Sequence, residues 1–449
     1  MKIAIAQCLI ISTLILLISL SSFAQNKKPN IILILADDLG VGDLGSYGQK
    51  FIKTPNLDEM AKNGIKFTNF YSSSPVCAPS RASLMTGLHQ GHARIRGNNN
   101  FKGERVSLQP QDKTIAEIAK SANYRTALIG KWGLGEEGTP GIPNKKGFDY
   151  FFGYLNQTLA HNYYPETLWR NKEKITLEKG TYTPNLFQNE VEEFIKREKD
   201  NPFFIYYSTI LPHANNELTR QTGNGMEIPS NEPYQNQNWT IQQKNYAAMV
   251  SLLDKQVGQI NKLLRKLKLD KNTIVMFMSD NGPQGKAEGG YEQELFQSNM
   301  GLRGIKRSLY EGGIRSPLLV QWNGKIKPNL INQTAATQYD LFPTIADLIG
   351  IKEKYSTDGK SFKQQLFGKK STKQNYQYWE FYEGGFVQVI RFGNWKGLRK
   401  GINGKTELYN LKKDERETTD VSKSFPEIVK QIELIMKREH IDSEDWKVN

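Results

Sequence analysis

The 449-residue sequence contains only two cysteines and five histidines. Two cysteines exclude a disulfide scaffold. Five histidines and the lack of any HExxH or CxxC pattern disfavour a zinc enzyme, whose metal would need His or Cys ligands. Apart from Leu9–Leu20, no stretch approaches about 20 consecutive apolar residues, so we expect no stable membrane insertion. The 38 glycines follow no period, which excludes collagen.

Aromatic residues and basic charge are abundant. The 21 Phe, 20 Tyr and 7 Trp can fill a large core, which disfavours a disordered chain. Lys and Arg exceed Asp and Glu by 60 − 46 = 14. A basic surface suits a polyanion, and we expect a partner other than nucleic acid. Heparin-like binding stays open beside any catalysis, although such charge usually means solvated lysines.

The N-terminus has the layout of a secretory signal peptide. A lysine at the second position precedes Leu9–Leu20, and a small-x-small pattern ends at Ala24. We therefore expect cleavage of residues 1–24 and a periplasmic or secreted mature protein. The alternative is a membrane anchor, but the apolar run is short for a bilayer. Cleavage would remove Cys8 and leave Cys77 as the single cysteine.

Apolar, β-branched runs alternate with segments of helical period. The runs cover residues 30–36, 124–129, 202–208, 273–279 and 317–322. The helical segments cover residues 54–63, 114–122, 186–198, 242–267 and 340–349. This alternation predicts an α/β domain with a large, mostly parallel sheet sandwiched by helices. We place this domain over residues 25–355.

The last part of the chain has a different pattern. Short strands separated by Gly and Asn turns are typical of an antiparallel sheet, and a helical segment over residues 426–438 follows them. The strands are expected at residues 376–381, 386–392, 395–399 and 407–411. We therefore predict a smaller C-terminal α+β subdomain over residues 356–449.

Cys77 stands where a loop enters a predicted helix. Pro79 suits a first helical turn, so Cys77 would lie near a helix N-terminus, where N–H groups favour anions. Arg81, one turn along, would add positive charge. A lone cysteine in an oxidising compartment is an inert buried residue, an intermolecular link or a special reagent. The surrounding pattern favours a nucleophile held in an anion pocket.

Two acidic pairs directly follow two of the predicted strands. Asp37 and Asp38 follow the first strand, and Asp280 and Asn281 follow residues 273–279. Functional side chains collect at the carboxyl ends of parallel strands. Three carboxylates and an amide there would need a hard cation, Ca²⁺ or Mg²⁺. Either pair alone would suit a helix cap equally well, but the two pairs together favour a metal site.

Together these motifs resemble the type I, formylglycine-dependent sulfatases of the alkaline-phosphatase-like superfamily. Cys77-Ala78-Pro79-Ser80-Arg81 and Thr86-Gly87 match the family signature, and Glu407–Leu411 resembles its C-termini. The resemblance implies a bacterial, arylsulfatase A-like carbohydrate sulfatase. It also implies that a formylglycine-generating or sulfatase-maturating enzyme converts Cys77 to formylglycine. One hydroxyl of the hydrated aldehyde would attack sulfur, and the other would later expel sulfate.

The resemblance also implies individual roles. Calcium, or alternatively magnesium, would be held by the two acidic pairs and the modified cysteine, namely Asp37, Asp38, Cys77, Asp280 and Asn281. Positive side chains would neutralise the sulfate, and a histidine would protonate the leaving group. The catalytic residues would thus be Cys77, Arg81, Lys131, His213 and Lys306. The family stretch Tyr310–Arg315 is expected to be architectural.

One position departs from the family pattern. Gly133 stands where most members have a histidine in Gly-Lys-Trp-His-Leu-Gly. In many members that imidazole lies near the formylglycine hydroxyl and is thought to aid its deprotonation. The role is unassigned here, and His92 and His161 are candidates to fill it.

Two loops rich in amides suit a sugar, since amides and carboxylates bond hydroxyl groups. The candidate sugar contacts are His161, Asn215, Asn216 and Glu217. Similarity to sulfatases adds Glu380 and Gln388 as residues that would close the pocket. Ordinary loop polarity is the alternative. We expect exo action on sulfated glycans, and similarity to a bacterial branch favours 4-sulfated galactose or N-acetylgalactosamine.

Two rival functions differ in their site residues. A phosphatase or phosphodiesterase of the same superfamily would use Ser or Thr with two zinc ions, which Cys77 and the scarcity of histidine disfavour. A non-catalytic protein that binds sulfated glycans would have lost Cys77 or an aspartate ligand, and neither is lost.

Overall fold

The computed structural model describes residues 28–448 except 292 and 370–375. The predicted signal peptide lies outside these residues. No helix of the described part combines the length and the apolar character needed to cross a membrane.

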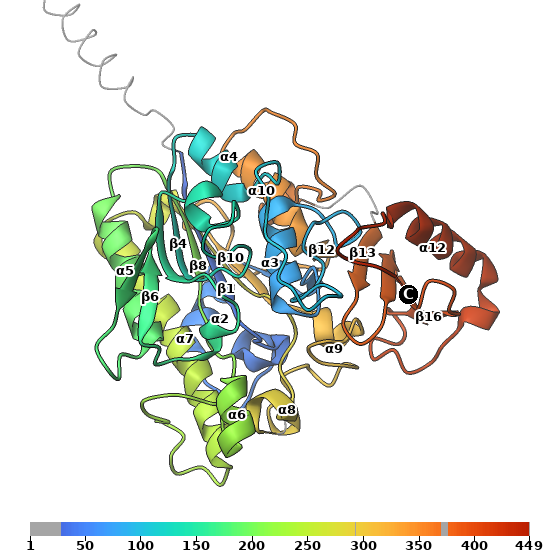
Figure 1. Ribbon diagram of the computed structural model, residues 1–449, viewed down its shortest axis with the longest axis horizontal. Coiled ribbons are helices and arrows are strands. Elements are labelled where there is room, and N and C mark those ends of the chain that lie inside the picture. Colours follow the sequence, from blue (N-terminus) through green and yellow to red (C-terminus); the bar gives the residue numbers. More distant parts are fainter. Residues whose placement is uncertain (1–27, 292, 370–375, 449) are drawn as a thin grey trace, which may run out of the picture.

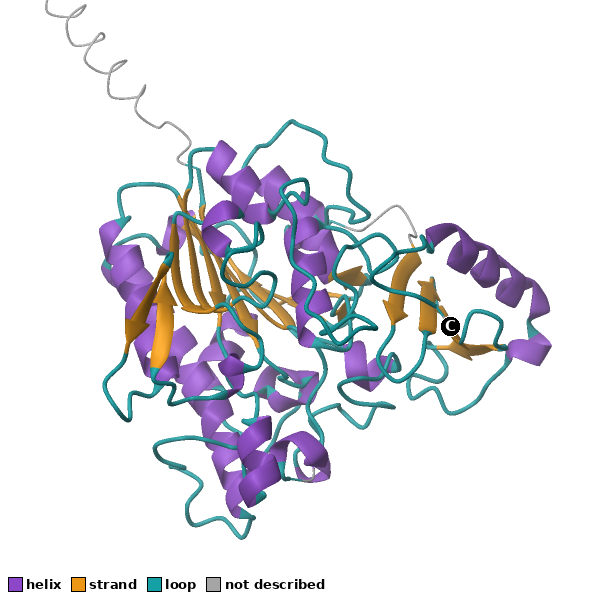
Figure 2. Ribbon diagram, viewed as in Figure 1, coloured by secondary structure: helices purple, strands orange, loops and turns teal. Residues whose placement is uncertain are grey.

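A large mixed sheet forms the centre of the main body (Figures 1 and 2). Ten strands pair in it among the described residues, and the central five are mutually parallel. In spatial order the strands are β11 (Leu330–Asn332), β2 (Ile65–Phe67), β10 (Leu318–Gln321), β9 (Thr273–Ser279), β1 (Asn30–Ala36), β8 (Phe203–Ser208), β4 (Arg125–Lys131), β5 (Tyr150–Tyr154), β6 (Thr167–Arg170) and β7 (Glu173–Thr176).

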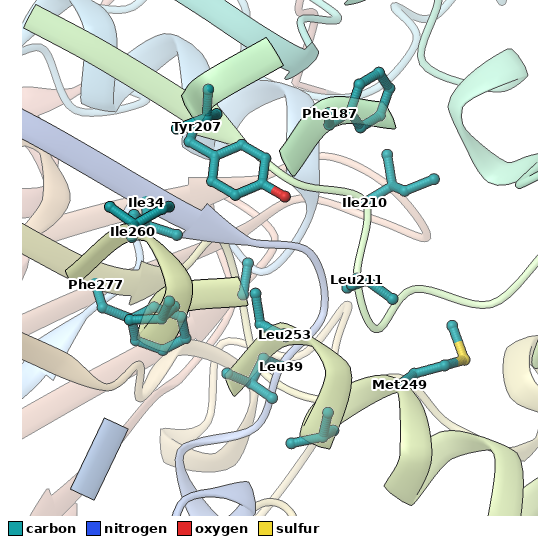
Figure 3. Packing of buried hydrophobic residues seen from close by; sticks show 14 of the residues in the cluster. Ile34, Leu39, Phe187, Tyr207, Ile210, Leu211, Met249, Leu253, Ile260 and Phe277 are labelled. Atoms are coloured by element: carbon teal, nitrogen blue, oxygen red, sulfur yellow. The ribbon is translucent and has the colours of Figure 1, made fainter. Parts of the chain in front are cut away.

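Helices cover both faces of the sheet, because the central strands carry apolar side chains on both sides. Ile32 and Ile34 pack on one face and Leu33 and Leu35 on the other. The first face is covered by α2 (Pro55–Lys62), α5 (Thr183–Arg197) and α7 (Ile241–Lys266). The second is covered by α3 (Cys77–Thr86), α4 (Ile115–Ser121) and α10 (Leu341–Leu348). In Figure 3, Leu253 and Ile260 of α7 are seen with Ile34 and Phe277 of the sheet.

A separate antiparallel sheet forms the C-terminal part. Its strands are β13 (Tyr376–Phe381), β14 (Val387–Phe392), β15 (Trp395–Lys400) and β16 (Thr406–Asn410). Helix α12 (Pro426–Glu439) packs on it through Ile432 and Met436. Both lie at the right of Figure 1.

The smaller sheet is fixed to the main body by apolar and charged contacts. Trp379 packs against Tyr71, and its indole Nε1 donates to the Ser72 carbonyl at 2.8 Å. Lys396 Nζ lies 3.0 Å from Glu311 Oε1, and both side chains are fully buried. Glu311 belongs to α9 (Glu311–Ile314), inside the family stretch that was expected to be architectural.

The predicted fold class is confirmed, with additions at the sheet edges. The antiparallel strands β6 and β7 extend the sheet beyond β5, and β10 pairs antiparallel to β9. The remaining short strands and α-helices are β3 (Phe70–Tyr71), β12 (Ala336–Thr337), α6 (Asn216–Thr222), α8 (Lys286–Gly289) and α11 (Lys363–Leu366). The domain boundary at residues 355 and 356 stays a prediction.

Candidate functional site

The two acidic pairs lie side by side at the carboxyl ends of β1 and β9. These strands pair in parallel, with Ala36 opposite Ser279. The Asp38 amide donates to Asp280 Oδ1 at 3.0 Å, which joins the two pairs. Asp38 has a φ of 59°, a left-handed conformation that is unfavourable for a residue with a Cβ. The surrounding contacts hold this strained backbone, as is common at functional sites.

Cys77 is the first residue of α3 and is buried against the first acidic pair. Its Sγ lies 3.5 Å from Asp37 Oδ1 and 4.0 Å from Asp38 Oδ1. Burial raises the pKa of the Cys77 thiol well above its ordinary value. The unmodified thiol would therefore stay protonated and be a poor nucleophile.

The donor set around this point fits a hard divalent cation. Oxygens of Asp37 and Asp38, the Cys77 sulfur and a His213 nitrogen all lie within 4.8 Å of one another. The amide nitrogen of Asn281 donates to Asp38 Oδ1 at 2.7 Å, whereas its buried Oδ1 has no partner. A buried acceptor without a partner is costly, so a cation there would satisfy it.

Each carboxylate of the cluster has a buried cation at contact distance. Lys131 Nζ lies 2.7 Å from Asp37 Oδ2, and Lys306 Nζ lies 2.7 Å from Asp38 Oδ2. Arg81 Nη2 lies 2.7 Å from Asp280 Oδ2. All six of these side chains are at most 3% exposed. The sequence placed these residues in one site, and the structure brings them together.

Burial and neighbouring charges shift the carboxyl pKa values in opposite directions. Burial alone would raise the pKa of Asp37, but Lys131, His213 and Arg81 hold it well below its usual value. Burial raises the pKa of Asp38 to about 6 despite Lys306. Burial and the charge of Asp37 raise that of Asp280 to about 7. A divalent cation would offset the cost of keeping these carboxylates ionised.

His213 follows β8 and faces the second lysine. Its Nδ1 donates to the Ala214 carbonyl at 2.6 Å, so in the neutral ring Nε2 carries the lone pair. That Nε2 lies 3.1 Å from Lys306 Nζ and 3.2 Å from Asp38 Oδ2. Burial and the Lys306 charge lower the pKa of His213 to about 3. The free site therefore holds a neutral imidazole whose Nε2 points at the reacting centre.

His161 belongs to the same site. Its ring stacks on His213 with centroids 4.5 Å apart, and its Nδ1 donates to Glu217 Oε2 at 3.0 Å. Burial lowers the pKa of His161 to about 2, with a further lowering from His213 once that ring is protonated in acid. Of the amide candidates, Asn215 caps α6 through Leu218 N and donates to Glu227, so its side chain is already occupied. Asn216 Oδ1 is buried without a partner.

The space beside Gly133 is filled by a glutamine that the sequence analysis did not single out. Gly133 has a φ of 76°, and a Cβ there would come within 2.1 Å of Gln157 Oε1. Gln157 is 5% exposed, and neither of its amide atoms has a hydrogen-bond partner. Gln157 follows β5. Its position just beyond the end of a strand is the one sequence signal that could have identified it as a site residue.

Three predicted residues lie apart from the cluster. His92 Nδ1 donates to Asp358 at 2.8 Å and its ring lies against His89, so it does not take the place of the family histidine. Glu380 and Gln388 are fully buried in the C-terminal part. Glu380 pairs with His440 at 2.6 Å, and Gln388 donates to the Met436 carbonyl at 3.2 Å. They support α12 rather than close a pocket over Cys77.

Comparisons with known proteins agree with this geometry. The family described as "Sulfatase" matches residues 29–351, and "N-sulphoglucosamine sulphohydrolase, C-terminal" matches residues 304–442. An N-acetylgalactosamine-6-O-sulfatase of Bacteroides thetaiotaomicron is 28% identical, with 92% of this chain and 93% of that protein covered. An N-acetylgalactosamine-6-sulfatase of Canis lupus familiaris is 31% identical, with 84% and 75% covered.

A solved structure supports the same assignment. The crystal structure of Ps i-CgsB in complex with k-i-k-neocarrahexaose superposes with a TM-score of 0.81 at 29% identity, with 94% of this chain and 95% of that chain covered. The chain therefore belongs to the sulfatase family, with its alkaline-phosphatase-like fold, and is a sulfuric ester hydrolase.

Proposed function

We propose that the enzyme removes sulfate from sulfated galactose or N-acetylgalactosamine at the cluster around Cys77. The observation that carries the proposal is the position of the Cys77 sulfur, at a helix N-terminus and against Asp37 and Asp38. Buried lysines pair with both aspartates. The names of two similar sulfatases supply N-acetylgalactosamine, and the resemblance to a bacterial branch adds galactose.

The charge of the site would favour an anionic substrate once a divalent cation is bound, because the cluster itself is neutral. Buried carboxylates and buried cations balance in the cluster, 3 − 3 = 0. The carboxylates are those of Asp37, Asp38 and Asp280, and the cations are Arg81, Lys131 and Lys306. A divalent cation, Ca²⁺ or alternatively Mg²⁺, would be held by Asp37, Asp38, Asp280, Asn281 and the modified Cys77. When bound, it would polarise a sulfate oxygen and withdraw charge from sulfur.

The three cationic side chains have different roles. Arg81 is bound to Asp280 and also lies 3.4 Å from Asp37, so it fixes and neutralises the carboxylates. Lys131 keeps N–H donors beyond its contact with Asp37. Lys306 Nζ also contacts His213 and Glu288, so it would exchange one of these contacts for a sulfate oxygen. Both ammonium groups would hold the sulfate oxygens. Such fixed donors stabilise developing charge without reorganisation.

His213 would deliver the proton to the leaving oxygen. The Ala214 carbonyl fixes the ring, so only Nε2 is available for this transfer. Burial and the Lys306 charge keep the imidazole neutral in the free enzyme. A bound sulfate ester would offset the Lys306 charge and so raise the pKa of His213 toward its useful range. His161, stacked on His213, would orient the ring or contact the sugar.

The proposal also includes the modification of Cys77 and the way in which the substrate reaches it. Conversion of Cys77 to formylglycine by a formylglycine-generating or sulfatase-maturating enzyme would replace a protonated thiol with a hydrated aldehyde, consistent with a periplasmic or secreted protein. Cys77 is only 2% exposed. A sulfate on a terminal sugar reaches so buried a centre more easily than one inside a chain, which favours exo action.

The sulfate position has two candidates. Similarity to a bacterial branch favours the 4-position, whereas the two similar sulfatases described above are named for the 6-position. A panel of 4-sulfated and 6-sulfated galactose and N-acetylgalactosamine, assayed for inorganic sulfate, tests both. Release from one positional isomer identifies the bond, and release from neither by fully converted enzyme would overturn the proposed sugar class. Phosphate esters serve as the comparison for a phosphatase, which the comparisons with known proteins do not favour.

A further inference from the structure

A continuous row of contacts crosses the site from helix α6 to the C-terminal sheet. On one side Glu217 holds His161, which stacks on His213. His213 Nε2 contacts Lys306, and Lys306 Nζ lies 3.4 Å from Glu288 Oε1. The row therefore passes the reacting centre and continues beyond it.

On the far side the row ends in a charged rim. We use "the rim" for Glu288, Arg307 and Glu383. Arg307 Nε lies 3.4 Å from Glu288 Oε1, and its Nη1 lies 2.5 Å from Glu383 Oε2. Glu383 Oε1 accepts from the Asn98 amide at 2.9 Å, and Asn98 Oδ1 accepts from the amide of Ala78, the residue after Cys77, at 3.2 Å. These hydrogen bonds connect the rim to the residue next to Cys77, so the C-terminal part lies beside the site.

The side chains of the rim are partly exposed, and the backbone at Arg307 has a strained conformation. The Arg307 side chain is 50% exposed, and those of Glu383 and Glu288 are 24% and 16% exposed. Arg307 has a φ of 70°, and its amide donates to the Pro75 carbonyl at 2.9 Å. A left-handed backbone conformation is strained for arginine. The surrounding contacts therefore hold Arg307 next to Lys306 at a cost in conformational energy.

We propose that Arg307 and Glu383 recognise the sugar that carries the sulfate, and that this sugar is neutral apart from the ester. The inference rests on the proposed function of the same site. Two carboxylates flank one guanidinium, so the rim has a formal charge of 1 − 2 = −1. Carboxylates accept from hydroxyl groups, and the guanidinium donates to ring or hydroxyl oxygens. A uronate or a second sulfate here would meet both glutamates and displace an ion pair of Arg307.

The test compares Arg307→Gln and Glu383→Gln with the parent on two substrates. One is a galacto-configured monosaccharide monosulfate, and the other is 4-nitrophenyl sulfate, which has no sugar hydroxyls. Glutamine at 383 can still accept from Asn98, so the fold should persist, and thermal unfolding checks this. Arg170→Gln, which breaks the similarly exposed pair with Glu190, is the matched control.

We expect both rim variants to lower kcat/KM for the sugar sulfate at least about tenfold, mainly through KM, and to change aryl sulfate turnover by less than about twofold. The control should change neither. The parent should also prefer the monosulfated sugar over its disulfated analogue. Equal losses on both substrates, no loss, or preference for the disulfated sugar would overturn the inference while leaving the sulfatase assignment intact. Failure of the converted parent on every sugar sulfate would instead overturn the proposed function.

Discussion

At the scale of single residues, the assigned proton donor makes a clear prediction. A sugar alkoxide is a poor leaving group and needs protonation, whereas 4-nitrophenolate leaves readily. We expect His213→Gln to lower kcat for a sugar sulfate roughly 10²–10⁴-fold and to affect 4-nitrophenyl sulfate far less. Steady-state kinetics on both substrates measures this difference. An equal loss on the two would show that His213 binds sulfate rather than moving a proton.

Gly133 makes a prediction about stability. Alanine at this left-handed position should cost about 1–2 kcal/mol, and its Cβ would displace the Gln157 amide. Chemical denaturation of Gly133→Ala, Gln157→Ala and the double variant measures both effects. We expect Gly133→Ala to cost less when Gln157→Ala has emptied the space, because only the backbone strain remains. An identical cost in both backgrounds would contradict this account of the glycine.

Residue types and spacing located part of the site. Asp37, Asp38, Asp280 and Asn281 were found because they directly follow buried strands, and the structure brings them together. Gln157 was missed because the sequence does not tell where a loop side chain points. The rim was missed because it joins residues far apart in the chain, whose pairing depends on how the C-terminal part docks on the main body.

At the scale of elements, the long periodic segments were predictable, whereas some of the shortest strands were not. Helix α7 begins at Ile241 and ends at Lys266, one residue from each predicted bound, and β13 matches residues 376–381. Strands β2 and β6 were not predicted, because segments of three or four residues carry few alternations. Strand β10 is equally short but was predicted, because it lies inside the longer apolar run of residues 317–322.

The end of α12 provides a pH-dependent contact. The hydrogen bond to Glu380 raises the pKa of His440, against the effect of burial. Protonated His440 therefore adds stability that is fully present below its unfolded pKa of about 6.5 and is lost as pH rises through the raised folded value. We expect the difference in Tm between the parent and His440→Gln to be larger at about pH 5.5 than at about pH 8.5.

The matched control for this contact is Asp442→Asn. Asp442 also lies near the imidazole but is fully exposed, so its removal should change Tm little at either pH. A Tm difference for His440→Gln that is the same at both pH values would contradict the role of the His440–Glu380 pair.

At the scale of the whole molecule, the proposed cation would be held at the carboxyl ends of β1 and β9 in the main sheet. Without a cation there, Asn281 Oδ1 has no partner, and burial disfavours the ionised forms of Asp38 and Asp280. We expect a chelator to abolish sulfate release and lower Tm. Added Ca²⁺ at about 100 times its Kd should restore about 2.7 kcal/mol. Substitution of Mg²⁺ tests the alternative ion. Unchanged activity and Tm in metal-depleted enzyme, verified by elemental analysis, would contradict the site.

The most direct test of the whole account concerns the chemical state of Cys77. In enzyme co-expressed with a formylglycine-generating enzyme, the peptide containing Cys77 should be about 18 Da lighter than its unmodified form. Sulfate release by such preparations should rise in proportion to the converted fraction, and Cys77→Ala should release none. Sulfate release from the Cys77→Ala variant at the rate of the parent would contradict the account.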